Sequence, residues 1–154
     1  MSKIEQRLAE LGIELEEPPQ PKFAYVPAKT FGNYVYVSGH DCRVKGVLKY
    51  EGKVGKELTK EQGYDAARQV AINILSTLKA HLGDLDRIQQ FVKVLGFVNS
   101  APGFVEQPYV INGASELFEQ VFGEKGKHAR SAVSANELPF NTPVEIEVLV
   151  EIAQ

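Results

Sequence analysis

The chain has 154 residues, 44% hydrophobic and 24% charged, which is typical of one globular domain and excludes a disordered or fibrous protein. No apolar run approaches the roughly 20 residues that span a bilayer, and the N-terminus lacks the apolar stretch of a secretory signal. Cys42 is the single cysteine, so no disulfide can form within the chain. We therefore expect a cytoplasmic protein without membrane contact. The net charge of −3, with Lys and Arg scattered among acidic residues, argues against a nucleic-acid partner.

The first segment has the pattern of a short amphipathic helix over residues 2–11. Ser2 and Glu5 have the spacing of a capping box, and apolar residues recur on one face. The sequence EEPPQP follows, and its prolines bar regular structure. We therefore divide the chain into an N-terminal helix with a Pro-rich linker, residues 1–22, and a main domain, residues 23–154.

Short segments rich in Val and Tyr open the main domain. The sequences FAYVPA, residues 23–28, and NYVYVSG, residues 33–39, predict two strands with a turn at residues 29–32 between them. Residues 47–55 predict a third strand, although their glycines weaken that pattern.

Two amphipathic helices alternate with buried strands in the rest of the chain. Thr59 and Gln62 form a capping box before a long helix that ends at Gly83. An apolar strand is predicted at residues 88–98, and a second helix at residues 107–122.

The C-terminal part predicts two more strands. They cover residues 129–135 and 144–153, with a turn at residues 138–142 between them. Strict alternation in VEIEVLVEI places Val and Ile on one face of the last strand and mainly glutamates on the other. The order of elements predicts an α+β fold in which two helices cover one face of a mixed sheet. Apolar residues remain for the second face, namely Tyr34 and Tyr36 or their Val neighbours, together with Leu149, so we expect an oligomer.

Arg130 and Glu145 are the main candidate site residues. An arginine at the start of a strand, like Arg130, can grip a carboxylate through two parallel N–H bonds, but it can equally form a surface ion pair. Glu145 can activate a water molecule beside a substrate, or it can be a solvated strand glutamate like Glu147. Similarly, Tyr25 can form the wall of a pocket or belong to the core or an interface.

Other chemistry is disfavoured by spacing. His40, Asp41 and Cys42 are neighbours after a strand, but adjacent strand residues point to opposite faces and rarely form a catalytic pair. No second Cys or His pair provides zinc spacing. The sequence GEKGKH, residues 123–128, lacks the spacing of a phosphate loop and follows a helix instead of preceding one.

Several of these segments together resemble the Rid family, also called YjgF-like or reactive intermediate deaminase proteins. The resemblance rests on YVYVSG at residues 34–39, on Asn112 and Glu116 in the second helix, and on RSAVSANELP followed by VEIEV. It covers about residues 23–154, and the N-terminal extension is similar to that of a poorly characterised subgroup.

The resemblance implies a fold like that of the chorismate mutase of the bacillus type. Family members are homotrimers whose sheets form a central barrel with three clefts between subunits. Deaminating members hydrolyse 2-imino or 2-enamino acids to 2-oxo acids and ammonia, without metal or cofactor. The implied ligand is therefore a small metabolite that carries a carboxylate.

The resemblance also assigns roles to individual residues. Arg130 would bind the substrate carboxylate, and Glu145 would hold or activate the attacking water. Substrate-binding positions would be Ser38 and Gly39, which offers backbone contacts, together with Asn112 and Tyr25, which shape the cleft from different subunits.

The sequence departs from the family pattern beside the arginine. Many deaminating members have a cysteine two residues after the arginine, where this chain has Ala132, and a proline two residues before it, where this chain has His128. Residues 40–50 also fit the common pattern poorly. Three other readings therefore stay open: an endoribonuclease, a trimeric binder of small carboxylates without catalysis, and a mutase-like isomerase suggested by fold alone.

Overall fold

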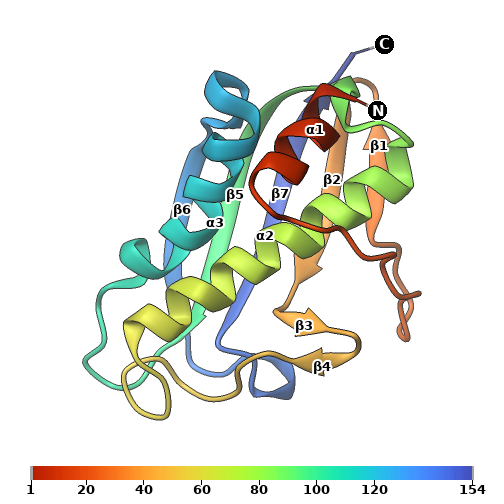
Figure 1. The fold of residues 1–154 in the computed structure, drawn as a ribbon. Coiled ribbons are helices and arrows are strands. Elements are labelled where there is room, and N and C mark those ends of the chain that lie inside the picture. Colours follow the sequence, from red (N-terminus) through yellow and green to blue (C-terminus); the bar gives the residue numbers. More distant parts are fainter. Residues whose placement is uncertain (1, 154) are drawn as a thin grey trace.

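The computed structural model describes residues 2–153 and consists of a five-stranded mixed sheet with three helices on one face (Figure 1). The sheet order is β1-β2-β7-β5-β6, and only the β5–β6 pair is parallel. The predicted α+β fold is confirmed. The strands are β1 (Ala28–Phe31), β2 (Tyr34–His40), β5 (Ile88–Asn99), β6 (Ala129–Ala135) and β7 (Val144–Ile152), and the helices are α1 (Lys3–Glu10), α2 (Lys60–Leu82) and α3 (Gln107–Phe122).

The core lies between the sheet and helices α2 and α3. The alternation in β7 determines which face is buried, because Val144, Ile146, Val148 and Val150 all point toward the helices and are at most 4% exposed. The predicted capping box of α2 is present: Thr59 Oγ1 accepts from Gln62 N, and the Gln62 side chain accepts from Thr59 N.

Helix α1 packs on the main body. Ser2 caps it as predicted, because its hydroxyl accepts from Glu5 N at 3.0 Å. The buried side chain of Leu8 joins the common hydrophobic core, and Arg7 Nε donates to Gln120 O at the end of α3. The Asp86 carboxylate accepts from the first two backbone N–H groups of the helix at 2.9 and 3.0 Å.

The first predicted strand is wrong in position. Residues 23–28 are irregular up to Pro27, and β1 instead uses residues 28–31, of which residues 29–31 were expected to form the turn. The hairpin turns at Gly32, whose φ of 60° suits glycine, so that Ala28 pairs with Val37. The pairing with β2, which is not encoded in local composition, overrides the Val and Tyr content of FAYV.

The third predicted strand, residues 47–55, is also wrong. The chain forms a small separate hairpin of β3 (Arg43–Val44) and β4 (Val47–Leu48). Lys45 and Gly46 turn it with φ values of 52° and 82°, and positive φ at Gly52 and Gly55 prevents a longer strand. Short 3₁₀ turns occur at Leu85–Arg87, Gly123–Gly126 and Pro139–Asn141.

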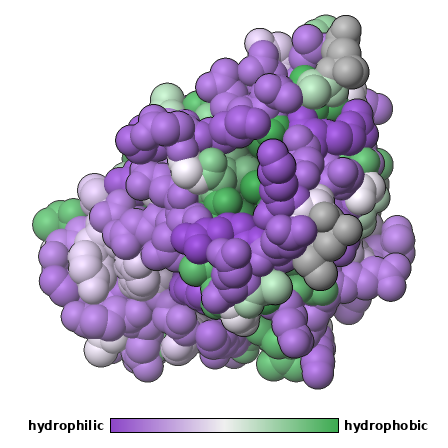
Figure 2. Space-filling model, turned by 45° about the horizontal axis from the view of Figure 1, so that its top comes forward, coloured by the Kyte–Doolittle hydropathy of each residue, from purple (hydrophilic) through white to green (hydrophobic). Residues whose placement is uncertain are grey.

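The sheet face opposite the helices carries exposed apolar side chains. Tyr34, Tyr36 and Val133 on this face are 40%, 54% and 41% exposed, in agreement with the apolar surplus expected from the sequence. By contrast, the surface in Figure 2 is mostly hydrophilic, and hydrophobic side chains gather there only in small areas.

Candidate functional site

Strand β6 places Arg130 against helix α3. Arg130 Nη1 donates to Asn112 Oδ1 at 2.7 Å and to Ser115 Oγ at 3.2 Å, and Nη2 donates to Pro108 O at 3.4 Å. All three partners are neutral, and Arg130 takes part in none of the ion pairs formed within residues 2–153. Burial lowers the pKa of Arg130, but a guanidinium remains charged at neutral pH. The arginine is thus held in place without being neutralised.

His128 extends this hydrogen-bond network. Its Nδ1 lies 2.7 Å from Gly126 O, and because a carbonyl can only accept, Nδ1 carries the proton. Nε2 therefore accepts from the Ser115 hydroxyl at 2.8 Å, and Ser115 in turn accepts from Arg130. Burial, assisted by the positive charge of Arg130, lowers the pKa of His128 and favours this neutral form.

Glu145 lies on β7 and faces Gly39 of β2. A Cβ atom added at Gly39 would lie 2.8 Å from Glu145 Oε2, so only glycine fits beside the carboxylate in this position. Burial raises the pKa of Glu145, and the negative charges of Asp41 and Glu147 raise it further. A carboxylate with a raised pKa is a stronger proton acceptor than an ordinary glutamate.

Arg130 and Glu145 project from opposite faces of the sheet. Arg130 pairs with Val94 of β5, and Glu145 pairs with Phe97 of the same strand. Since side chains alternate along a strand, positions 94 and 97 point to opposite faces. Arg130 accordingly contacts α3, whereas Glu145 lies on the face away from the helices. One copy of the chain does not bring the two candidate residues together.

The other predicted site residues divide between the same two groups. Asn112 lies with Arg130, and Gly39 lies with Glu145. Ser38 Oγ donates to Val26 O at 2.7 Å, which fixes the segment that carries the half-exposed Tyr25 next to β2. We call Arg130, Asn112 and Ser115 the arginine group, and we call Glu145 and Gly39 the glutamate group.

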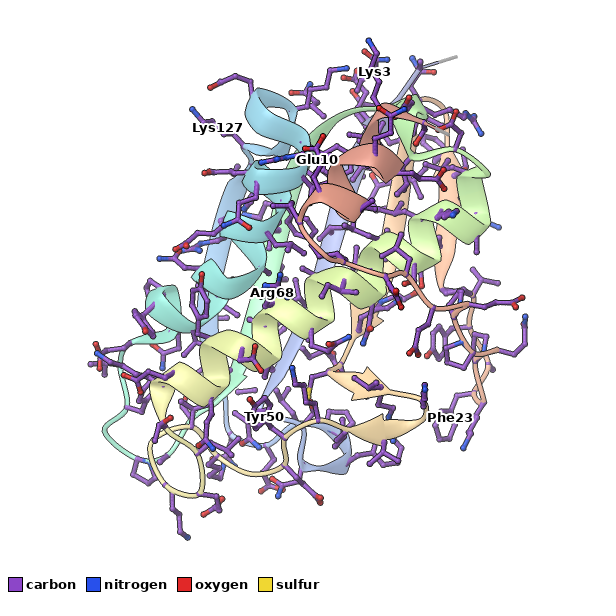
Figure 3. All side chains as sticks on the ribbon, viewed as in Figure 1. Lys3, Glu10, Phe23, Tyr50, Arg68 and Lys127 are labelled. Carbon is purple, nitrogen blue, oxygen red and sulfur yellow. The ribbon has the colours of Figure 1, made fainter. Side chains whose placement is uncertain are left out.

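A cavity of about 670 Å³ adjoins the glutamate group. Gly39 and Tyr25 line it together with the Pro-rich linker. Figure 3 shows Phe23, the residue that follows this linker, close to the β3–β4 hairpin. A smaller cavity of about 160 Å³ lies between the linker and α2 and includes none of the predicted site residues.

Sequence reasoning did not identify Ser115, and it left the role of His128 open. A signal for Ser115 was present, because it follows Asn112 by three residues and therefore shares its helix face. Glu116, which supported the family resemblance, instead accepts from Tyr64 OH at 2.8 Å.

Cys42 is fully buried, with its Sγ 3.8 Å from Thr142 Oγ1, so its thiol is not accessible for catalysis. Residues 2–153 contain no cluster of three or more His, Cys, Asp or Glu side chains arranged to hold a metal ion. No helix within this range is long and apolar enough to cross a membrane.

Comparison with known proteins gives consistent matches over nearly the whole chain. The family model described as "YjgF/chorismate_mutase-like, putative endoribonuclease" matches residues 5–152. Protein TCP17 of Trypanosoma cruzi is 43% identical over 153 residues, which cover 97% of this chain and 94% of that protein. Among solved structures, Atu1372 of Agrobacterium tumefaciens, described as of unknown function, is 46% identical with a TM-score of 0.92 and covers 98% of this chain and 93% of its own. A Shewanella oneidensis structure described as a putative endoribonuclease is 31% identical with a TM-score of 0.94 and covers 98% and 100%.

Proposed function

Since the chain belongs to the YjgF/chorismate mutase-like family, we propose that it hydrolyses 2-imino and 2-enamino acids to 2-oxo acids and ammonia. The observation that carries this proposal is the state of Arg130: it is fixed by neutral groups, and no carboxylate within residues 2–153 neutralises it. A partly buried charge of this kind favours an anionic ligand, because pairing recovers the interaction that desolvation removed.

The substrate carboxylate is expected to bind Arg130. The bonds to Asn112 and Ser115 fix the plane of the guanidinium, so the remaining N–H groups present a fork that matches a carboxylate. Binding the carboxylate orients the adjacent carbon–nitrogen double bond of the imino acid in the cleft.

Glu145 is proposed to act as the general base. It accepts a proton from a water molecule as the water oxygen bonds to the iminium carbon and the π electrons of the C=N bond move to nitrogen. The resulting carbinolamine then transfers its hydroxyl proton to nitrogen, the C–N bond breaks, and ammonia leaves a 2-oxo acid. The raised pKa of Glu145 supports this role.

The complete cleft is proposed to form between copies of the chain in a homotrimer. Arg130 lies on the edge strand β6, while Gly39 and Glu145 lie on β2 and β7, on the opposite side of β5. Packing the open apolar sheet faces of three copies into a barrel would cover Tyr34 and Tyr36. The arginine group of one copy would then face the glutamate group of its neighbour.

The family model and the Shewanella oneidensis structure are both described as putative endoribonucleases, which makes ribonuclease activity the alternative. Against this reading, His128 and His40 both have their ring nitrogens engaged within the chain, and burial lowers the pKa of each. The net charge of −3 also provides little attraction for RNA. A binder without catalysis would use the same arginine but would not require Glu145.

The test is an assay of imine loss. Imino acids are generated in situ by an amino-acid oxidase, and semicarbazide traps the imine that remains while ammonia is measured. The proposal predicts faster imine loss with the wild-type protein and a strongly reduced acceleration with Arg130→Ala. Absence of acceleration across small, branched and aromatic imino acids would contradict it, and retained binding of 2-oxo acids would then favour the binder.

A further inference from the structure

The cavity beside the glutamate group is larger than the smallest 2-imino acids require. Its volume of about 670 Å³ lies within the range of pockets for drug-sized ligands. Gly39, which lies against Glu145, is part of its lining, so the cavity borders the proposed reaction centre at this residue. A substrate that reacts beside Glu145 therefore has space to extend its side chain under the Pro-rich linker.

The walls of this cavity are largely aromatic and proline side chains. Phe23, Tyr25 and Phe140 contribute to the lining although they are 68%, 52% and 61% exposed. Exposed aromatic rings that converge on one hollow gain free energy when an apolar group covers them. The same lining includes Pro18, Pro19, Pro21 and Pro27.

The polar groups in the cavity floor already have partners within the chain. His40 donates through Nδ1 to Ser38 O at 2.6 Å and accepts through Nε2 from Thr77 Oγ1 at 2.8 Å. The Asn73 amide donates to the backbone carbonyls of Asp41 and Arg43, each at 2.9 Å. These groups do not require a polar ligand, so they do not select for one.

One pair of charged residues at the cavity rim is balanced within the chain. Arg43 Nε donates to Asp41 Oδ2 at 3.1 Å, and its guanidinium lies 5.0 Å from the centre of the Phe140 ring. The arginine is therefore paired with a carboxylate and stacked on an aromatic face, in contrast to Arg130. A second carboxylate on the ligand would find no unpaired arginine here.

We infer that this cavity binds the side chain of the substrate and that the preferred substrates are 2-imino acids with large apolar, particularly aromatic, side chains. The inference rests on the proposed function for its reaction centre. The Pro-rich linker, which closes one side of the cavity, becomes a determinant of specificity.

Equilibrium binding tests this inference independently of turnover. Phenylpyruvate and pyruvate, the 2-oxo acids with and without a phenyl group, are titrated into the full chain by calorimetry. We expect phenylpyruvate to bind about tenfold more tightly or better, because its ring is buried in the cavity. Phe23→Ala should reduce this preference, whereas Val105→Ala, at an exposed apolar residue outside the cavity, should preserve it.

Equal affinity for the two ligands, or an unchanged preference in Phe23→Ala, would overturn the inference. A change in the oligomeric mass of Phe23→Ala would also overturn it, because Phe23 would then be an interface residue. A different result would contradict the proposed function itself, namely that no imino acid tested is hydrolysed. If hydrolysis occurs, kcat/KM for the phenylalanine-derived imine should exceed that for the alanine-derived imine by about tenfold.

Discussion

Arg130 and Glu145 lie on opposite faces of one sheet. Their pairing partners on β5, Val94 and Phe97, are three positions apart, and an odd separation along a strand places side chains on opposite faces. A carboxylate clamp and a general base on the same substrate must lie on the same side of a cleft or face each other across it. The geometry of one chain excludes the first arrangement, so the proposed chemistry depends on a second copy that presents its own arginine group.

Arg130→Ala should weaken substrate binding. Loss of charge-assisted hydrogen bonds to a carboxylate costs about 1.5–3 kcal/mol, so kcat/KM should fall roughly tenfold to a hundredfold. Arg130→Lys should recover only part of this loss, because an ammonium cannot form two parallel bonds. Lys127→Ala, at an exposed neighbour that pairs with Glu124, is the matched control and should behave like wild type. Unchanged 2-oxo acid affinity in Arg130→Ala would remove the clamp.

Glu145→Gln should abolish turnover but preserve ligand binding. Glutamine is nearly isosteric but cannot accept a proton from water, and a positioned general base contributes about 10²–10⁴-fold to rate. The measurement pairs the ammonia assay with calorimetric titration of a 2-oxo acid. If Glu145→Gln retains the wild-type rate, Glu145 is not the base.

The pH profile of kcat/KM should show the raised pKa of Glu145. The base acts only when deprotonated, so activity should fall as pH decreases through a pKa above the ordinary glutamate value. Because the charge of Asp41 contributes to that rise, Asp41→Asn should shift the acidic limb to lower pH. A limb at or below the ordinary pKa of glutamate, unmoved by Asp41→Asn, would contradict this assignment.

Gly39→Ala should damage activity through Glu145. The new methyl group would lie 2.8 Å from Oε2, but the end of a glutamate side chain can rotate away without unfolding the sheet. We expect about a hundredfold loss of turnover from the displaced carboxylate, with little change in the unfolding midpoint. In a Glu145→Gln background the same substitution should have almost no further effect on rate. Additive losses would show that Gly39 acts independently of Glu145.

His128→Ala should affect binding more than chemistry. Removing the acceptor of the Ser115 hydroxyl loosens Arg130, and one neutral hydrogen bond is worth about 1 kcal/mol, so KM should rise roughly fivefold with kcat nearly unchanged. His128→Asn, which retains an acceptor, should restore part of the affinity. Equal decreases in kcat for both variants would indicate a different role.

Local patterns predicted most elements because their causes are local. The capping box of Thr59 and Gln62 fixes the start of α2 within four residues of sequence, and the alternation in β7 fixes its buried face. The prediction of a strand at residues 23–28 was wrong because strand formation depends on the pairing partner. Strand β2 pairs with Ala28–Phe31 and leaves Tyr25 and Val26 exposed.

The residues of the candidate site could be proposed from the sequence, but their arrangement could not. Arg130 and Asn112 meet because β6 packs beside α3, a contact that the sequence did not specify. The relation of Arg130 to Glu145 depends on the registers of β6 and β7 with β5, and a single strand sequence does not specify them. Ser115 was missed although it shares a helix face with Asn112, because the partners of its hydroxyl, His128 and Arg130, are known only from the structure.

Complementation between two impaired variants tests the intersubunit cleft most directly. Arg130→Ala and Glu145→Gln are coexpressed in equal amounts with different tags, and the oligomers that carry both tags are purified and assayed for imine hydrolysis. If each cleft takes Arg130 from one copy and Glu145 from another, about one cleft in three contains both residues in a trimer that carries both variants. We therefore expect mixed oligomers to recover about a third of the wild-type rate, well above the rate of either variant alone. Mixed oligomers no more active than the single variants, alongside an active wild type, would show that the two residues do not serve one cleft.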